Sequence, residues 1–261
     1  MAQADVQQPP DYNLNGNLNR RWVWFITGPT ASGKTTIAKA LAQSLGFIFV
    51  EGDDYHPPQN RDKMSHNIPL TDADRTAWLR AIHDRETSNS ASSPPPSSPA
   101  QQQRQQQQHP DDPNSNNLII TCSALKRKYR DVLRGRHRDQ PQLDDDHDAD
   151  TPPAAARTPS QSQTLPHIRF VLLDVDASLL RERAAQRKGH FAGPGLVQSQ
   201  LQDLERPEGD SERDVVVVRV EKDQSVEETV KQVERRVREE MGRERMEMNG
   251  NGNGEGFLKV L

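Results

Sequence analysis

Five short apolar runs, each followed by an amphipathic stretch, constrain the fold of this chain more than any other feature. The runs cover Trp22–Thr27, Phe47–Val50, Leu118–Cys122, Ile168–Val175 and Val215–Val220. Their continuous apolarity is typical of strands buried on both faces of a parallel sheet. The stretches between them have helical spacing and are predicted as helices at Lys34–Leu45, Asp72–Glu86, Lys126–Arg134, Ala177–Gln186 and from Ser225 to about Glu240. The alternation predicts an α/β fold with a five-stranded parallel sheet and helices on both faces.

Four polar segments interrupt this pattern, at 1–20, 87–117, 139–166 and 243–261. They hold only 9 of the chain's 51 Leu, Ile, Val and Phe residues, so they bury too little apolar surface to offset the entropy lost on ordering. We expect one domain at 21–242 with two disordered tails and two disordered loop insertions, since closure entropy rises slowly with loop length. The glutamine tract within 87–117 could instead be an interaction element.

Composition excludes several classes of protein. A net charge of −4, from 34 basic and 38 acidic residues, gives no reason to expect nucleic-acid binding. No apolar run approaches the ~20 residues of a membrane span, and the N-terminus has no apolar signal core. Cys122 is the one cysteine, so we expect a reducing, cytoplasmic compartment. Because it lies in an apolar strand, Cys122 is predicted to be a core residue and not a nucleophile.

A phosphate-binding loop is predicted at residues 28–35. They read GPTASGKT, which fits the pattern G-x-x-x-x-G-K-[ST] between a predicted strand and a predicted helix. The backbone N–H groups of such a loop and the start of the helix favour a phosphate. Lys34 should reach the β- and γ-phosphates, and Thr35 should offer its hydroxyl to Mg²⁺. The alternative, a chance match in a Gly-containing turn, does not explain the correct flanks.

Acidic residues follow the second strand. Ligands bind beyond the carboxyl ends of parallel strands, so Glu51 and Asp53, on the same side of the chain, should face the cleft. One could hold Mg²⁺ through water and the other could accept a hydroxyl proton; a solvated acidic turn is the alternative. His56, before two prolines, is equally compatible with a turn residue and with a contact to the acceptor.

Two basic stretches could bind anions. Lys126–Arg130 enters a helix after the third strand, although such a helix start alone is more often solvated surface. Arg181–Phe191 is strongly basic and is followed by glycines, as in a mobile lid whose arginines close over phosphates; a solvated helix end is the alternative.

Taken together, these segments resemble the small P-loop gluconokinases, relatives of shikimate and adenylate kinases. The matching runs are GPTASGKTT (28–36), EGDDYHPPQNRDKM (51–64), IPLTDADRTAWL (68–79), TCSALKRKYRDVLR (121–134), RKGHF (187–191), LVQSQLQDLE (196–205) and ERDVVVV (212–218). The resemblance implies a three-layer P-loop NTPase fold with a small lid. It also implies Mg²⁺-dependent transfer of the ATP γ-phosphoryl to D-gluconate, giving 6-phosphogluconate for the pentose phosphate pathway. The expected partner is this small molecule, and a homodimer is compatible with the resemblance.

The resemblance also assigns residues. Asp53 would orient or deprotonate the acceptor hydroxyl, and Glu51 would stand in the second shell of the metal held by Thr35. Nucleotide binding falls to Gly28, Pro29, Thr30, Ala31, Ser32, Gly33, Lys34, Thr35 and Thr36. Contacts to the acceptor fall to Asp53, His56, Arg61, Lys63, Met64, Lys126, Arg130, His190 and Gln200. Lys34 and Asp53, with Arg183 and Arg187 as lid arginines, would form the catalytic set, with Lys188 nearby.

Two departures from the family pattern remain. Residues 192–195 are smaller than expected after the His-Phe pair, and compact members of the family lack the long polar insertions. The alternatives are a kinase for another small hydroxy acid such as shikimate, and a non-catalytic nucleotide-binding interaction protein. The second requires a damaged site, whereas Lys34, Thr35, Asp53 and Lys126 are all present.

Overall fold

One parallel sheet forms the centre of the molecule. The structure is a computed structural model that describes residues 21–66, 68–87, 117–136, 165–186 and 194–250. The strands are β1 (Trp22–Thr27), β2 (Ile48–Glu51), β3 (Leu118–Thr121), β4 (His167–Val175) and β5 (Val215–Val220). They lie in the order β2-β3-β1-β4-β5, and every neighbouring pair is parallel. The predicted five-stranded parallel sheet is confirmed.

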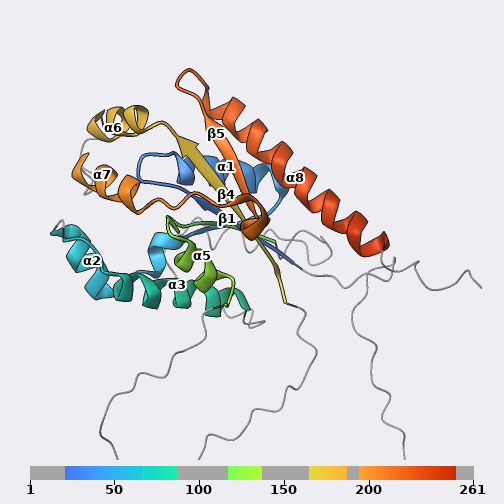
Figure 1. Cartoon of the computed structure of the whole chain (residues 1–261), viewed down its shortest axis with the longest axis horizontal. Coiled ribbons are helices and arrows are strands. Elements are labelled where there is room, and N and C mark those ends of the chain that lie inside the picture. Colours follow the sequence, from blue (N-terminus) through green and yellow to red (C-terminus); the bar gives the residue numbers. More distant parts are fainter. Residues whose placement is uncertain (1–20, 67, 88–116, 137–164, 187–193, 251–261) are drawn as a thin grey trace, which may run out of the picture.

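Helices cover both faces of this sheet (Figure 1). Their bounds are α1 (Lys34–Leu45), α2 (Pro58–Ser65), α3 (Asp72–Thr87), α5 (Arg127–Leu133), α6 (Ala177–Gln186), α7 (Pro194–Asp203) and α8 (Val226–Gly250). Short 3₁₀ helices lie at Gly52–Tyr55 (η1) and Gly209–Glu212 (η2). Figure 1 shows α2, α6 and α7 on the same side of the molecule, with α8 on the other.

The sheet separates two apolar clusters. Because side chains of a strand alternate between faces, Trp22, Trp24 and Ile26 of β1 join one cluster, whereas Val23 and Phe25 join the other. The first cluster packs against α1, α6, α7 and α8, and the second against α3 and α5. Both faces of β1 are therefore buried, which explains its continuous apolar sequence and confirms the three-layer arrangement.

The last helix begins as predicted but ends later. The backbone N–H of Ser225 donates to the Glu228 carboxylate (2.8 Å) and the N–H of Glu228 donates to the Ser225 hydroxyl (3.2 Å), forming the expected capping box. The helix then continues to Gly250, so the predicted end at about Glu240 is wrong. Glu244, predicted to lie in the polar tail, forms ion pairs with His167 and Arg169 of β4. The tertiary contact holds a segment whose own composition favoured disorder.

One insertion boundary also differs from the prediction. Asn117, assigned to the first insertion, is buried; its Oδ1 accepts a hydrogen bond from the Trp22 N–H (2.7 Å). Its carbonyl accepts one from the N–H of Ile48 (2.9 Å), so Asn117 joins the starts of β1 and β2. The remaining parts of the predicted tails and insertions lie largely outside the described residues, and the domain organisation stays a prediction.

Candidate active site

The loop between β1 and α1 curls as the predicted phosphate loop requires. Gly28, Ala31 and Gly33 all have positive φ angles, of 141°, 67° and 92°. A side chain at Gly28 would come within 3.1 Å of the Leu173 carbonyl oxygen, so only glycine fits this conformation without strain. The Ser32 N–H donates to the Pro29 carbonyl (3.2 Å) and tightens the turn.

The start of α1 is open to an anion. Gly33 caps the helix without a side-chain hydrogen bond, so the first backbone N–H groups carry the partial positive charge of the helix terminus. Lys34 Nζ donates to the Pro29 carbonyl (2.8 Å), which keeps the ammonium group beside the loop. The buried hydroxyl of Ser32 has no hydrogen-bond partner among the described residues. Thr36 is exposed one residue beyond Thr35. The loop thus offers donors and positive charge in one place.

Oxygen ligands stand beside this loop at the end of β2. The Thr35 hydroxyl donates to Glu51 Oε2 (3.0 Å), and the Thr121 hydroxyl of β3 donates to Glu51 Oε1. Burial raises the pKa of the Glu51 carboxyl above its ordinary value, and the charges of Asp53 and Asp54 act in the same direction. Predicted metal-site residues Thr35 and Glu51 are therefore in direct contact.

Asp53, which was predicted to orient or deprotonate the acceptor hydroxyl, lies in η1, directly after β2. Asp53 is 67% exposed, whereas His56 is 4% exposed, and Nε2 of His56 lies 3.8 Å from Asp53 Oδ1. The imidazole stacks on the Trp78 ring with 4.0 Å between centroids. Asp53 thus faces solvent, while His56, predicted to touch the acceptor, is packed inside the protein.

The buried thiol of Cys122 confirms its predicted structural role. Cys122 is 1% exposed and packs in the cluster under α3 and α5. Burial raises the pKa of its thiol. The negative charges of Asp53 and Glu51 raise it further, whereas the positive charge of Lys34 lowers it. The thiol is therefore shielded from solvent, as expected of a core residue.

The structure corrects the prediction for Arg130. This side chain is 2% exposed, and its Nε and Nη2 donate to the two oxygens of Glu212 (2.9 and 2.6 Å). Its Nη1 donates to the carbonyls of Ala124 and Leu125 (3.2 and 3.1 Å). Arg130 is therefore part of a buried ion pair that fixes the loop before α5, and its side chain is not a solvent-accessible cation.

Lys126 belongs to a charged cluster with Asp72, Arg75 and Asp203, three residues that the sequence analysis did not single out. Its Nζ lies 3.0 Å from Asp203 of α7 and 3.5 Å from Asp72 of α3. Arg75 lies 3.6 Å from the same Asp203 and donates to the Tyr129 hydroxyl (3.2 Å). The hydrogen bond to Asp203 raises the pKa of Lys126. The position of Arg75 in the 68–79 run was the one available signal for it.

The residues of α2 that were predicted to bind the acceptor contact His56 and helix α3. Arg61 Nε donates to the His56 carbonyl (2.9 Å), and Lys63 Nζ lies 2.8 Å from both oxygens of Asp74. Met64 is half-buried. None of these contacts tests their predicted binding of an acceptor.

The lid residues are partly described. Arg183 is half-buried on α6, and Arg187, Lys188 and His190 lie outside the described residues. The amide oxygen of Gln200 accepts a hydrogen bond from the Thr30 N–H (2.5 Å), so this residue of α7 contacts the phosphate loop. Gln200 therefore joins α7 to the phosphate loop, and its predicted contact with the acceptor stays a prediction.

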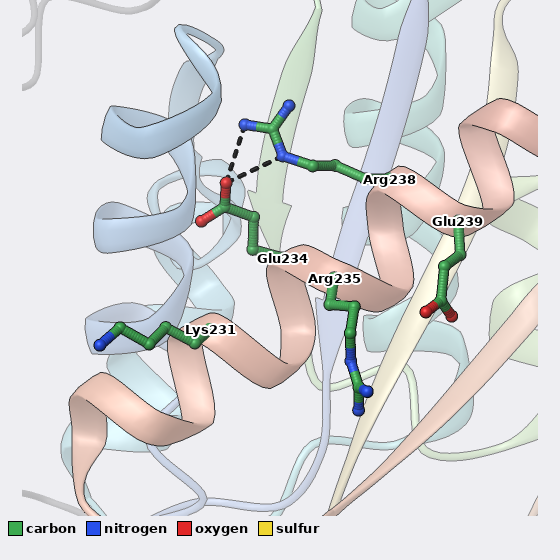
Figure 2. A pocket seen from close by; sticks show the side chains of 5 residues that line it. All are labelled: Lys231, Glu234, Arg235, Arg238 and Glu239. Carbon is green, nitrogen blue, oxygen red and sulfur yellow. Dashed lines mark hydrogen bonds and ion pairs between the residues drawn. The ribbon is translucent and has the colours of Figure 1, made fainter.

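A hollow on α8 is unrelated to this site. Figure 2 shows its lining side chains, Lys231, Glu234, Arg235, Arg238 and Glu239, all from one helix. Glu234 accepts hydrogen bonds from Arg238 Nε (2.9 Å) and from the Ser44 hydroxyl of α1 (2.7 Å). No residue of the phosphate loop lines this hollow.

In the described segments, no helix has the length and apolarity needed to cross a membrane.

The sheet, the phosphate loop and the Thr35–Glu51 pair define a P-loop kinase. A model of the family described as "AAA domain" matches residues 23–207. A probable gluconokinase of Schizosaccharomyces pombe is 34% identical over 225 residues, 85% of this chain and 93% of the relative. The thermosensitive gluconokinase of Escherichia coli is 31% identical over 200 residues, 77% of this chain and 80% of the relative.

A solved structure agrees with these relatives. The crystal structure of a gluconokinase from Sinorhizobium meliloti has 31% sequence identity and a TM-score of 0.57, covering 86% of this chain and 99% of that one. The chain belongs to the gluconokinase family.

Proposed function

We propose that this protein transfers the γ-phosphoryl group of ATP to the terminal hydroxyl of D-gluconate. One observation carries the proposal: the phosphate loop after β1 and the acidic residues Glu51 and Asp53 after β2 lie at the same carboxyl edge of the sheet, on either side of β3, and the Thr35–Glu51 hydrogen bond joins them. A nucleotide and a hydroxyl acceptor bound at this edge lie side by side. Membership of the gluconokinase family supplies the acceptor.

The residues present fit Mg²⁺. Among the described residues, no group of three or more His, Cys, Asp or Glu side chains could hold a metal alone. Mg²⁺ is commonly held by few protein oxygens together with water and nucleotide phosphates. Thr35 would supply its hydroxyl and Glu51 would orient a bound water. The ion would neutralise charge on the β- and γ-phosphates.

The chain's own groups position the reactants. Backbone N–H groups of the loop and the Lys34 ammonium bind phosphates, and the Asp53 carboxylate accepts a hydrogen bond from the acceptor hydroxyl and receives its proton. Lys126 and Arg75 are the cations that would hold the acceptor carboxylate. Both form ion pairs with Asp203, which keeps the two side chains close together. Arg183 on α6 is a further cation for the transferring phosphoryl group. Catalysis thus rests on positioning and charge stabilisation.

An ADP-release assay with D-gluconate as sole acceptor tests the proposal. We expect turnover with D-gluconate and much less with shikimate or glycerate. Lys34→Met should abolish turnover, because the phosphates lose their cation, whereas Asp53→Asn should lower kcat far more than it raises the KM for ATP. Turnover with shikimate but not D-gluconate would contradict the proposed acceptor. Absence of turnover with all three would leave a nucleotide-binding role.

Domain organisation and cell compartment complete the proposal. The buried thiol of Cys122 is compatible with a reducing, cytoplasmic compartment. We infer that the polar segments are loops and tails attached to one kinase domain. A variant lacking residues 88–116 should then keep its kcat, and loss of turnover would contradict passive insertions.

A further inference from the structure

The hydrogen bonds around His56 determine which ring nitrogen carries its proton. One atom of the Asn60 amide lies 3.0 Å from the carbonyl oxygen of Asp74. A carbonyl can only accept, so this atom is the amide nitrogen. The same nitrogen lies 3.4 Å from His56 Nδ1, which must therefore accept the second amide hydrogen. A neutral His56 with an accepting Nδ1 carries its proton on Nε2, the nitrogen 3.8 Å from Asp53 Oδ1.

The surroundings keep the imidazole neutral and fixed. His56 and Asn60 are 4% and 3% exposed, and the imidazole stacks on Trp78. The indole N–H of Trp78 in turn donates to the Gly52 carbonyl (2.7 Å), in the 3₁₀ turn that carries Asp53. Burial lowers the pKa of His56 to about 4; the charge of Asp53 opposes this shift, and those of Arg61 and Arg75 add to it.

We propose that His56, oriented by Asn60, donates its Nε2–H to the carboxylate of Asp53 and so positions that carboxylate for the acceptor hydroxyl. The inference rests on the proposed function, in which Asp53 meets the hydroxyl. His56 is a positioning residue and not a direct contact to the acceptor, because its ring edge faces Asp53 and its face is covered by Trp78. This role differs from the substrate contact expected from the sequence.

The two groups must come closer together for this hydrogen bond to form. At 3.8 Å the contact is longer than a hydrogen bond, and the exposed Asp53 carboxylate is the partner able to move. Catalytic hydrogen bonds commonly shorten when the substrate binds. With one oxygen held by His56, the other oxygen of Asp53 would be left to accept the hydrogen bond of the acceptor hydroxyl.

Two amide variants separate this role from simple packing. In Gln the side-chain amide reaches the place of Nε2, whereas in Asn it reaches only the place of Nδ1. Both variants lose the stack on Trp78 and should lose similar stability. We expect His56→Asn to lower kcat about 10- to 100-fold, the loss for one hydrogen bond to a charged group, with the KM for ATP unchanged. His56→Gln should retain clearly more kcat. Equal kcat values for the two variants would overturn the proposal.

A double-mutant cycle with Asp53→Asn supplies a second readout. If His56 acts through Asp53, His56→Asn should lower the kcat of the Asp53→Asn enzyme by less than about twofold. A full loss in that background would show an effect that bypasses Asp53 and would overturn the proposal. Should both amide variants fail to fold, His56→Phe, which keeps the stack but donates nothing, decides: a wild-type kcat contradicts the proposal.

The wild-type enzyme is measured first with D-gluconate. No turnover there would refute the proposed function, and the inference would fall with it. Normal wild-type turnover with unaffected His56 variants would refute the inference alone.

Discussion

Replacing Arg130 by Met should destabilise the protein without removing a substrate contact. The change deletes two hydrogen bonds to Glu212 and two to the carbonyls of Ala124 and Leu125, all in the interior. Removing one partner of a buried ion pair costs about 3–5 kcal/mol. Arg134 Nη2 still lies 2.8 Å from Glu212, so the lower end, about 3 kcal/mol, is expected. This is a large part of the ~5–15 kcal/mol that stabilises an ordinary domain.

Urea unfolding followed by tryptophan fluorescence measures the loss. With a slope of about 1–3 kcal/mol per molar urea, the midpoint should fall by about 1 M or more. Arg213→Met is the matched control, because Arg213 is 80% exposed and its ion pair with Asp210 is a surface one, so its effect should stay within about 0.5 kcal/mol. Adding Glu212→Gln to Arg130→Met should recover part of the loss, since no buried carboxylate then remains.

One result would refute this reasoning. If the urea midpoint of Arg130→Met equals that of the wild type while the KM for D-gluconate rises, Arg130 faces the acceptor after all.

Three further predictions concern stability and reactivity. Gly52→Ala should destabilise the domain by about 1–3 kcal/mol in urea unfolding, because the added carbon would lie 1.9 Å from the Thr121 carbonyl oxygen; Gly209→Ala, with open space around it, is the control and should change little. At Glu212, burial would raise the pKa, but hydrogen bonds from two arginines outweigh it and lower the pKa to about 2. Because this folded pKa is below the ordinary 4.5, the charged Glu212 carboxylate stabilises the fold above pH 4.5, and this stabilisation is lost as pH falls towards 2. The gap in unfolding free energy between wild type and Glu212→Gln should therefore narrow over that range. A constant gap would contradict the lowered pKa. Cys122 should resist iodoacetamide in the native protein and react after unfolding, as mass spectrometry can follow; rapid native labelling would contradict its burial.

Elements with a strong local pattern were predicted well. The strands Trp22–Thr27 and Val215–Val220 and the helices Lys34–Leu45 and Ala177–Gln186 match the structure residue for residue. Their apolar residues recur at the spacing of a buried strand or of one helix face, so the pattern can be recognised from residues that are close in the sequence. By contrast, α2 was not predicted as a helix, because its residues are mostly polar and carry no apolar stripe.

Residues in basic stretches could not be sorted by pattern. Lys126 and Arg130 belong to one basic helix start, yet Lys126 is half-buried beside Asp72 and Asp203, whereas Arg130 is fully buried. The difference comes from Glu212, 82 residues further along the chain, which supplies a buried counter-charge. His56 is similar, since the sequence shows a turn before two prolines but not the Trp78 ring that covers it.

The sequence by itself therefore determined the layers of the fold, the phosphate loop and the family, because apolar periodicity and the glycine spacing of the loop are local properties of the chain. Only the tertiary structure decided which polar side chains are buried and with which partners they pair. Burial and pairing of a charge depend on partners distant in sequence, as Glu212 is for Arg130 and Asp203 is for Lys126. A charged or imidazole side chain has no fixed role until its partners are in place, because pairing and solvent access decide its free energy and its proton.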